Sequence, residues 1–181
     1  RAIANNSNKT ATLKTGTTGI DDVDVKIYDD ETLLDTVTTD NGTFSKTLTA
    51  SIVSSKTYKA VYEGDGTYAS ATSSDVNVTI VKRTPTISLV TSSASVTTGD
   101  SYTLSGALLY NGSGLGSVNI KLYDGNTLLD TLTTGNDGTF SKSITSSVAG
   151  TFSYKAIYEG DATYNNVESS IVNVVVSDRQ S

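Results

Sequence analysis

The side chains that most often do chemistry in proteins are scarce in this chain of 181 residues. It contains no His, no Cys and no Met, which excludes zinc fingers, cysteine nucleophiles and Ser-His-Asp triads. Because no thiol is present, no disulfide can stabilise the fold. For the same reason, the sequence does not indicate whether the protein works in an oxidising or a reducing compartment. We therefore expect no enzyme activity, no catalytic residue and no cofactor.

The acidic residues offer one oxygen-rich cluster. Asp21, Asp22 and Asp24 precede an expected strand and are weak candidates for a Ca²⁺ site. Their spacing does not match an EF-type loop, and Asp is common in turns, so a turn is the simpler interpretation. A hydrolase built on paired carboxylates would also need a cleft with aromatic platforms, and the sequence carries neither signature.

Two lysines fall on an apparent core face. Lys46 is in phase with Phe44 and Leu48, and Lys142 is its counterpart further along the chain. Burying an unpaired Lys is costly, so the simple expectation is a lysine that extends its ammonium group to the surface. The alternative is an isopeptide cross-link to an Asn or Asp, for which we note Asn77 and Asn173, although their alternation points them outward.

Other residues could carry modification or contacts. Tyrosines that recur in both halves of the chain are best explained by the scaffold, whereas Tyr110 has no counterpart and is expected in a surface loop. Sequons of the form Asn-x-Ser/Thr make N-glycosylation a prediction if the host performs it. These sequons begin at Asn5, Asn8, Asn41, Asn77 and Asn111.

An internal repeat organises the chain. Residues 23–81 and 118–177 share the strings T-L-L-D-T, G-T-F-S-K and Y-E-G-D, and about half of their aligned positions are identical. The offset is 95 residues and becomes 96 after Gly135, an extra residue at a turn. A period of this length indicates a whole domain rather than a solenoid unit.

Within each repeat, apolar and polar residues alternate over short segments. Val23, Val25 and Ile27 share one face of an expected strand, and clusters of Gly, Asn and Asp separate such segments. Helical periodicity is absent, so the pattern indicates an all-β sandwich or barrel. The equivalent core positions are expected to be Val25 with Ile120, Phe44 with Phe140, and Tyr62 with Tyr158.

The order of these motifs resembles a known family. The strings V-x-I-x-L-Y-D-G-x-T-L-L-D-T, N-D-G-T-F-S, Y-x-G-D-x-x-Y and V-x-V-x-V resemble the bacterial Ig-like repeats of large surface adhesins. Adhesin-like proteins of methanogenic archaea carry similar repeats. The most specific segment is Y-E-G-D-x-T-Y, at residues 62–68 and 158–164. The resemblance implies a cell-surface stalk or adhesion role without catalysis, and it supplies no binding residues.

Together these features predict two tandem immunoglobulin-like β-sandwiches arranged end to end. The first repeat spans residues 1–83 and lacks part or all of its first strand, and the second spans residues 84–181. The junction Lys82-Arg83-Thr84 leads directly into Pro85 without a Gly/Ser linker, which favours a stiff rod. Because the chain begins at Arg1 rather than Met, we interpret it as a trimmed or excerpted segment.

The missing strand has a structural consequence. The first repeat has no counterpart of residues 84–95, which leaves an open edge beside Val76, Val78 and Ile80. A strand from another chain could pair there, or residues 1–15 could exchange amide hydrogens faster than residues 86–108. We favour the second outcome, because neither end of the chain offers a strong donor strand.

The leading function is an extracellular, cell-surface spacer that holds a binding tip away from the cell. One alternative is a filament or virion subunit assembled by strand exchange with copies of itself. A second alternative is a module that binds a cell-surface glycan or protein through loops of the second repeat, such as Leu109–Ser117 and Asn165–Asn166. The net charge of −6 argues against nucleic acid as a partner, and no apolar run is long enough for membrane insertion.

Overall fold

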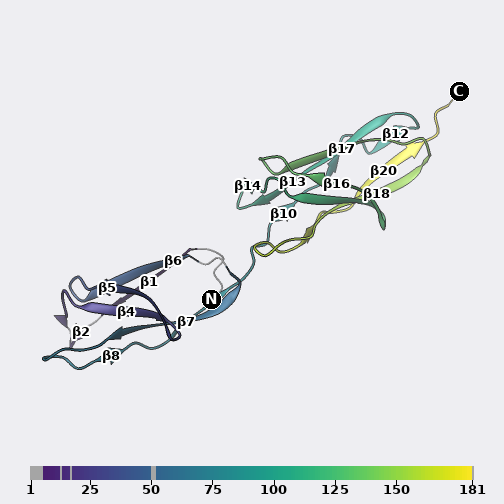
Figure 1. The fold of residues 1–181 in the computed structure, drawn as a ribbon. Helices are drawn as coiled ribbons and strands as arrows, with labels where there is room; N and C mark the ends of the chain where they lie inside the picture. The colour runs from purple at the N-terminus through teal and green to yellow at the C-terminus, as the bar shows by residue number, and fades with distance from the viewer. Residues whose placement is uncertain (1–5, 13, 17, 50–51, 181) are drawn as a thin grey trace. The chain divides into compact units, whose positions relative to one another are not determined.

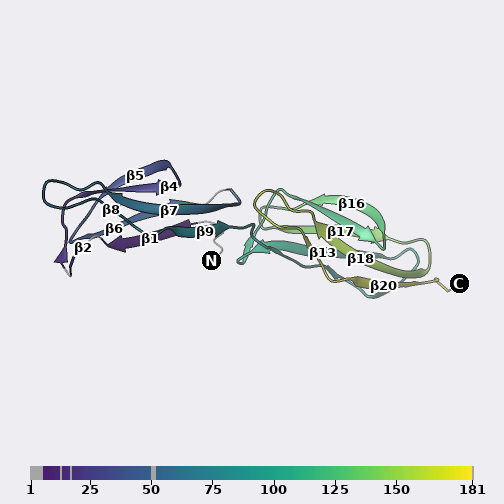
Figure 2. The same cartoon turned by 90° about the horizontal axis from the view of Figure 1, so that it is seen from below.

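The chain folds into strands that belong to two compact units. The structure, a computed structural model, describes residues 6–12, 14–16, 18–49 and 52–180. The units comprise Arg1–Lys82 and Arg83–Ser181. The described residues contain no helix, so none of them forms a helix able to cross a bilayer. The course of the strands within each unit can be followed in two views (Figures 1 and 2).

The second unit is a sandwich of two sheets. In one sheet β13 pairs on one side with β10 and β11 and on the other with β17, and it also pairs with β14. The other sheet has the order β12-β20-β18-β15-β16, with β19 beside β18. The first sheet consists of β10 (Thr86–Ile87), β11 (Val90–Thr91), β13 (Ser101–Tyr110), β14 (Ser113–Gly114) and β17 (Thr139–Thr145). The second consists of β12 (Ser95–Thr97), β15 (Asn119–Asp124), β16 (Thr127–Thr133), β18 (Gly150–Tyr158), β19 (Val167–Glu168) and β20 (Val172–Ser177).

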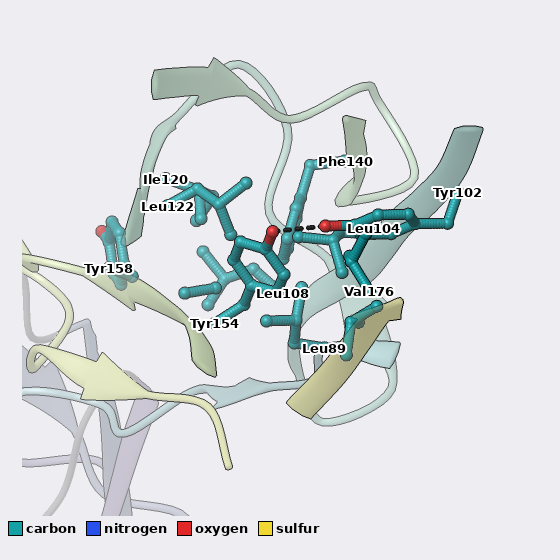
Figure 3. Close-up of a cluster of buried hydrophobic side chains, with 12 residues drawn as sticks. Leu89, Tyr102, Leu104, Leu108, Ile120, Leu122, Phe140, Tyr154, Tyr158 and Val176 are labelled. Carbon is teal, nitrogen blue, oxygen red and sulfur yellow. Dashed lines mark hydrogen bonds between the residues drawn. The ribbon is translucent and has the colours of Figure 1, made fainter. Parts of the chain in front are cut away.

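The core of the second unit lies between these sheets (Figure 3). Leu104 and Leu108 enter it from β13, and Ile120 and Leu122 enter it from β15. All four side chains are at most 1 % exposed, because their strands turn alternate residues toward the opposite sheet. The remaining buried members of this cluster are Leu89, Tyr102, Phe140, Tyr154, Ala156, Tyr158, Val174 and Val176.

The first unit repeats this arrangement in part. β5, β4, β7 and β8 lie in order in one sheet, where β9 also pairs with β7, and β1 pairs with β6 in the other sheet. The strands are β1 (Asn6–Thr12), β4 (Asp24–Asp29), β5 (Thr32–Thr38), β6 (Thr43–Thr49), β7 (Ser54–Tyr62), β8 (Ala71–Thr72) and β9 (Val76–Ile80). A short hairpin joins β2 (Lys14–Thr15) and β3 (Thr18–Gly19).

The expected core pairs are buried in both units, with one difference. Val25 and Ile120 are 2 % and 0 % exposed, and Tyr62 and Tyr158 are also buried. Phe140 is buried, whereas Phe44 is only half-buried. Phe140 belongs to a cluster that includes Leu89, from the segment between β10 and β11, and the described residues of the first unit contain no counterpart of these two strands.

The register of the first strand follows the internal repeat. Lys9 pairs with Lys46 in the first unit, as Leu104 pairs with Lys142 in the second. The first unit therefore forms the equivalent β1–β6 ladder, although its residues there are polar where β13 contributes Tyr102 and Leu104 to the core.

Candidate functional site

The three candidate calcium ligands make separate contacts. Asp21 accepts a hydrogen bond from the backbone N–H of Asn41 at 2.8 Å, and Asp24 accepts one from the Thr38 hydroxyl at 3.3 Å. Asp22 has a positive φ of 58°, as expected for a turn residue. Across the residues that the structure describes, no group of three or more acidic side chains is placed to hold a metal ion.

Asp22 and Asp24 do line an open pocket of about 360 Å³ in the first unit. Two of the charged groups that line it are paired with each other, since Lys26 forms an ion pair with Glu63. That hydrogen bond raises the pKa of Lys26, so the cation persists beside the carboxylates. The second unit repeats this ion pair between Lys121 and Glu159, with Nζ and Oε1 2.7 Å apart. A contact that recurs in both units is explained by the scaffold.

Lys46 and Lys142 lie in ion pairs rather than alone in the core. Lys46 Nζ is 2.7 Å from Asp35 Oδ2, and Lys142 Nζ is 3.0 Å from Asp130 Oδ2. Each lysine side chain keeps more than a third of its surface exposed, which agrees with the expected surface-reaching ammonium groups. Asn77 contacts the Thr57 hydroxyl on the neighbouring strand instead, at 3.0 Å.

The segment Y-E-G-D-x-T-Y forms a tight turn in each unit. The Asp65 carboxylate accepts hydrogen bonds from the backbone N–H groups of Thr67 and Tyr68 at 2.7 and 2.8 Å. These bonds hold the pKa of Asp65 below its ordinary value. Gly64 has a φ of 84°, and a Cβ there would lie 2.7 Å from the backbone nitrogen of Ser70. The motif therefore fixes backbone geometry, and its most specific residues are structural.

Its second copy follows the same design. Asp161 accepts from the N–H groups of Thr163 and Tyr164 at 2.7 and 2.8 Å, and Gly160 has a φ of 82°. Burial raises the pKa of the neighbouring Tyr158 to about 12, with a further contribution from the Asp161 carboxylate.

Tyr110 is the last residue of β13 rather than part of a loop. Its ring packs edge-on against Tyr164 with centroids 5.8 Å apart, and the Arg83 guanidinium lies 5.1 Å from the Tyr110 ring centroid. The Arg83 backbone is bound as well, since its N–H donates to the Thr163 carbonyl and its carbonyl accepts from the Asn165 N–H. Of the loops noted as candidate binding surfaces, Leu109–Ser117 thus contributes Tyr110 to a cation–aromatic cluster, and Asn165 contacts the same Arg83 through its backbone N–H.

The described sequon asparagines lie in turns or on strands. Asn41 and Asn111 lie in turns with positive φ, and Asn77 is exposed on β9. Asn8 lies on β1, and Asn5 is outside the described residues.

The predicted open edge lies on β9. Val78 and Ile80 of this strand are buried, whereas Val76 is 42 % exposed. Asn173, considered as a cross-link partner of a lysine, accepts a hydrogen bond from the Ser153 hydroxyl at 2.7 Å.

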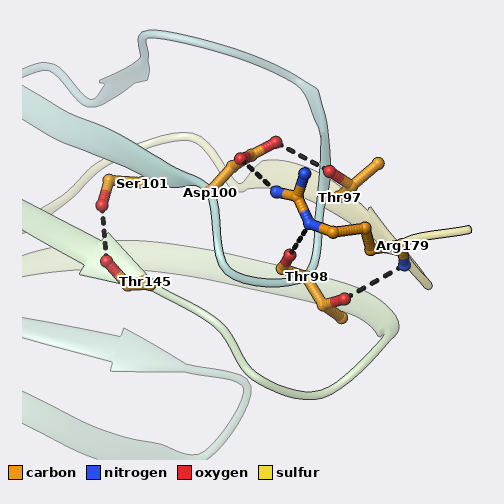
Figure 4. A network of polar contacts seen from close by, with 6 residues as sticks. All are labelled: Thr97, Thr98, Asp100, Ser101, Thr145 and Arg179. Carbon is orange, nitrogen blue, oxygen red and sulfur yellow. Dashed lines mark hydrogen bonds and ion pairs between the residues drawn. The ribbon is translucent and has the colours of Figure 1, made fainter. Parts of the chain in front are cut away.

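A polar network that the sequence did not reveal closes the far end of the second unit (Figure 4). Arg179 Nη2 lies 2.6 Å from Asp100 Oδ1, and Arg179 Nε donates to the Thr98 carbonyl at 3.1 Å. Hydrogen bonds from Thr97 and Arg179 lower the pKa of Asp100. The sequence alone does not predict this contact, because nothing local links Arg179 to a turn 79 residues earlier.

This network lies beside a parallel strand pair in the second unit. β12 pairs with β20 in the register Ser95 to Val175 and Thr97 to Ser177, and the Thr98 N–H donates to the Ser177 carbonyl. β12 lies near the beginning of the unit and β20 near its end. A force that separated the two ends would therefore load all the bonds of this pair together in shear.

Comparison with known proteins gives one family match. Residues 89–177 match the model described as bacterial Ig-like domain (group 3). A search of curated proteins found no match.

Several solved structures are similar at low identity. The D0–D1 domains of intimin share 14 % identity, covering 96 % of this chain and 93 % of that chain, with a TM-score of 0.39. The adhesin InvE of Yersinia pseudotuberculosis shares 14 % identity over 96 % of this chain and 56 % of that chain, with a TM-score of 0.39. The fibronectin(III)-like modules of Clostridium thermocellum CbhA share 19 % identity over 51 % of this chain and 96 % of that chain, with a TM-score of 0.41.

Proposed function

Because residues 89–177 belong to the bacterial Ig-like domain family (group 3), we propose that the chain is a non-catalytic module of a cell-surface adhesin. In this role the tandem units act outside the cell as a stalk that carries tension between an anchor and a binding tip. The strands and their contacts, rather than a cleft, are then the functional part of the molecule.

The observation that carries this proposal is the clamp formed by β12, β20 and Arg179. The parallel pair joins the beginning of the second unit to its end. Arg179, which follows β20, binds the Thr98 carbonyl and the Asp100 carboxylate. Several hydrogen bonds that must break at once resist force better than bonds that open one at a time. Resistance to forced unfolding is a kinetic property, set by the rate of unfolding under load.

The polar residues shared by the two units also favour a structural role. The Lys–Asp pairs connect sheets, since Asp35 and Lys46 lie on β5 and β6, and Asp130 and Lys142 lie on β16 and β17. The Asp65 and Asp161 carboxylates hold turns. These recurring side chains thus form ion pairs and hydrogen bonds within their own unit. Such internal contacts favour a structural role over ligand binding.

Single-molecule pulling of the whole chain by its two ends tests the proposal. We expect two unfolding events, with the second unit resisting the higher force because the described residues of the first unit offer no strand parallel to β9. Arg179→Ala should lower the higher force and leave the other unchanged. Lys155→Ala is the matched control, because it removes an ion pair to Glu168 that does not join β12 to β20.

Two results would contradict the stalk role. One is unfolding of the second unit at a force no higher than that of the first. The other is saturable binding of a glycan or protein that is lost on Tyr110→Ala, which would instead support the loops of the second unit as a recognition site.

A further inference from the structure

Two long edge strands lie on one side of the second unit. β16 ends its sheet and pairs with β15, and β17 pairs with β13. On the other side of each strand, the described residues place no further strand. Each strand has seven residues, so each presents a long row of backbone N–H and C=O groups to solvent. Such a row is a template on which a strand of another chain can pair.

The edges on the opposite side of this unit are protected by their shortness. β10 and β11 have two residues each, and β12 has three. β10 also directly follows Pro85, which has no backbone N–H to donate. Short strands and proline are common means of preventing pairing at a sheet edge. The longer edges of β16 and β17 therefore need another means.

The composition of β16 and β17 favours pairing with other chains. Their sequences are T-L-L-D-T-L-T and T-F-S-K-S-I-T, and each contains one charged residue, Asp130 or Lys142. Segments rich in apolar and β-branched residues, with few charges and no Pro, are typical of sites of aggregation. Leu128 and Leu129 of β16 are also exposed. Without these two charges, both edges would be uncharged, apolar and open.

Both charged side chains lie on the core-facing side of their sheets. Asp130 is opposite the buried Leu122 on β15, and Lys142 is opposite the buried Leu104 on β13, so each shares a face with a core residue. Lys142 Nζ lies 3.0 Å from Asp130 Oδ2, and the two side chains keep 40 % and 38 % of their surface exposed. The ion pair therefore occupies the rim of the sandwich, which a strand added to β16 or β17 would cover.

The first unit has the same arrangement. Its edge strands β5 and β6 also have seven residues each, and Asp35 and Lys46 are the charged residues in them. Lys46 Nζ lies 2.7 Å from Asp35 Oδ2. A pair that recurs at the same point of the two edge strands in each unit indicates a property of these edges.

We propose that the Asp130–Lys142 pair, like the Asp35–Lys46 pair, prevents these edge strands from pairing with those of a second copy of the chain. A strand added to either edge would continue the sheet over the rim and remove water from both ions. Burying two ions is costly even when they are paired, so the pair opposes the gain from new backbone hydrogen bonds. The inference goes beyond the stalk role and does not depend on it.

A purely stabilising role for the pair predicts different behaviour. Exposed ion pairs contribute little to stability, and replacing an ion pair by apolar residues is often neutral or stabilising. If the pair protects the edges, its replacement by apolar side chains should leave the unit folded and make the protein self-associate. If the pair acts on stability alone, the same change should lower the unfolding midpoint and leave the protein monomeric.

Sedimentation velocity of the full chain over a series of concentrations tests the proposal. The variant carries Asp130→Leu and Lys142→Met. The matched control carries Lys121→Met and Glu159→Leu, which remove another ion pair of the second unit. Lys121 belongs to β15, which has a neighbouring strand on both sides. Both double variants keep the net charge of the wild type, because each loses one cation and one anion.

We expect the Asp130→Leu, Lys142→Met variant to self-associate at least about tenfold more tightly than the wild type, and the control to behave as the wild type does. Hydrogen exchange of the associated variant should show added protection of the amides of β16 and β17, compared with the same variant at low concentration. Its urea unfolding midpoint at low concentration should match that of the control.

Two outcomes would overturn the proposal. One is a folded Asp130→Leu, Lys142→Met variant that remains as monomeric as the control. The other is association that protects other strands and leaves β16 and β17 unchanged.

Circular dichroism checks that the variant keeps its β-structure. If it does not, Asp130→Asn with Lys142→Gln carries the test, because it removes both charges and keeps polar side chains of similar size. This second variant should also associate more tightly than the wild type, and a monomer equal to the wild type would overturn the proposal as well.

Discussion

The ammonium group of Lys46 on β6 lies 2.7 Å from Asp35 Oδ2 on β5, and this ion pair joins the two sheets of the first unit. Lys142 and Asp130 repeat the contact at 3.0 Å between β17 and β16. A lysine that seemed to face the core thus reaches the rim of the sandwich, where its charge is partly solvated and also paired.

This contact predicts a pH dependence. The Lys46 hydrogen bond, followed by the Thr36 N–H, holds the pKa of Asp35 below its ordinary value, and Lys142 and Thr131 do the same for Asp130. A carboxyl whose folded pKa is lowered stabilises the fold above its unfolded pKa, about 3.9, and this contribution is lost as pH falls through the folded pKa. We expect the Asp35→Asn, Asp130→Asn double variant to lose less stability than the wild type below about pH 4.

The measurement is the urea unfolding midpoint as a function of pH, because guanidinium chloride would screen the ion pairs. Near neutral pH the double variant should be slightly less stable than the wild type, since exposed ion pairs contribute weakly, and the two should converge in acid. Asp178→Asn, a change at an exposed carboxylate, is the control. Parallel pH profiles for the wild type and the double variant would contradict the assignment.

The hydroxyl groups of Tyr102 and Tyr154 hydrogen-bond each other inside the core of the second unit (Figure 3). Tyr102→Phe leaves the Tyr154 hydroxyl buried without this partner, which should cost about 1–3 kcal/mol in the free energy of unfolding. Replacing both tyrosines with Phe should recover part of that loss in a double-mutant cycle. Additive losses from the two single variants would mean that the hydroxyls do not interact.

The buried tyrosines also limit stability at high pH. Burial raises the pKa of Tyr158 to about 12, and burial followed by the hydrogen bond with Tyr102 raises that of Tyr154. Because these groups ionise more easily in the unfolded chain, near pH 10, their contribution is complete below pH 10 and falls as pH rises toward the folded pKa. Tyr158→Phe should reduce the loss of stability of the second unit between about pH 10 and 12, measured by chemical denaturation.

Gly106 is predicted to be intolerant of any side chain. Its Cβ would lie 1.9 Å from the Ser88 carbonyl oxygen and 2.7 Å from Cζ of Phe140, and a backbone group cannot give way cheaply. Gly106→Ala should destabilise the second unit by about 1–3 kcal/mol or more. Gly66→Ala should have little effect, because no atom lies within 4 Å of its Cβ position. Calorimetry of both variants makes the comparison, and equal unfolding temperatures would refute it.

A pocket of about 250 Å³ beside Ile27, Phe44 and Val76 predicts that the first unit is less stable than the second. The first unit lacks, within its described residues, the equivalents of Ile87 and Leu89, and each such burial is worth roughly 1.5–3 kcal/mol. Amides of β7 should therefore exchange faster with deuterium than amides of β18, their counterparts. Equal protection of the two strands in a monomer would indicate that another segment covers the core of the first unit.

The amino-acid sequence by itself determined the class of fold and most core positions. Alternation along Val23, Val25 and Ile27 assigns one face of a strand, and the repeat at 95 residues assigns the same face in the second unit. These features are local, because side-chain direction in a strand follows the backbone with a period of two. The turn role of Asp65 could likewise be read from its Gly-Asp context.

Only the tertiary structure decided which polar groups meet. The partner of Lys46 is Asp35 on the neighbouring strand of the opposite sheet, and the partner of Arg179 is Asp100 in a turn. It also showed that Tyr110 packs against Tyr164. Such contacts depend on how two sheets pack and on strand pairing between distant segments, and neither leaves a local pattern in the sequence.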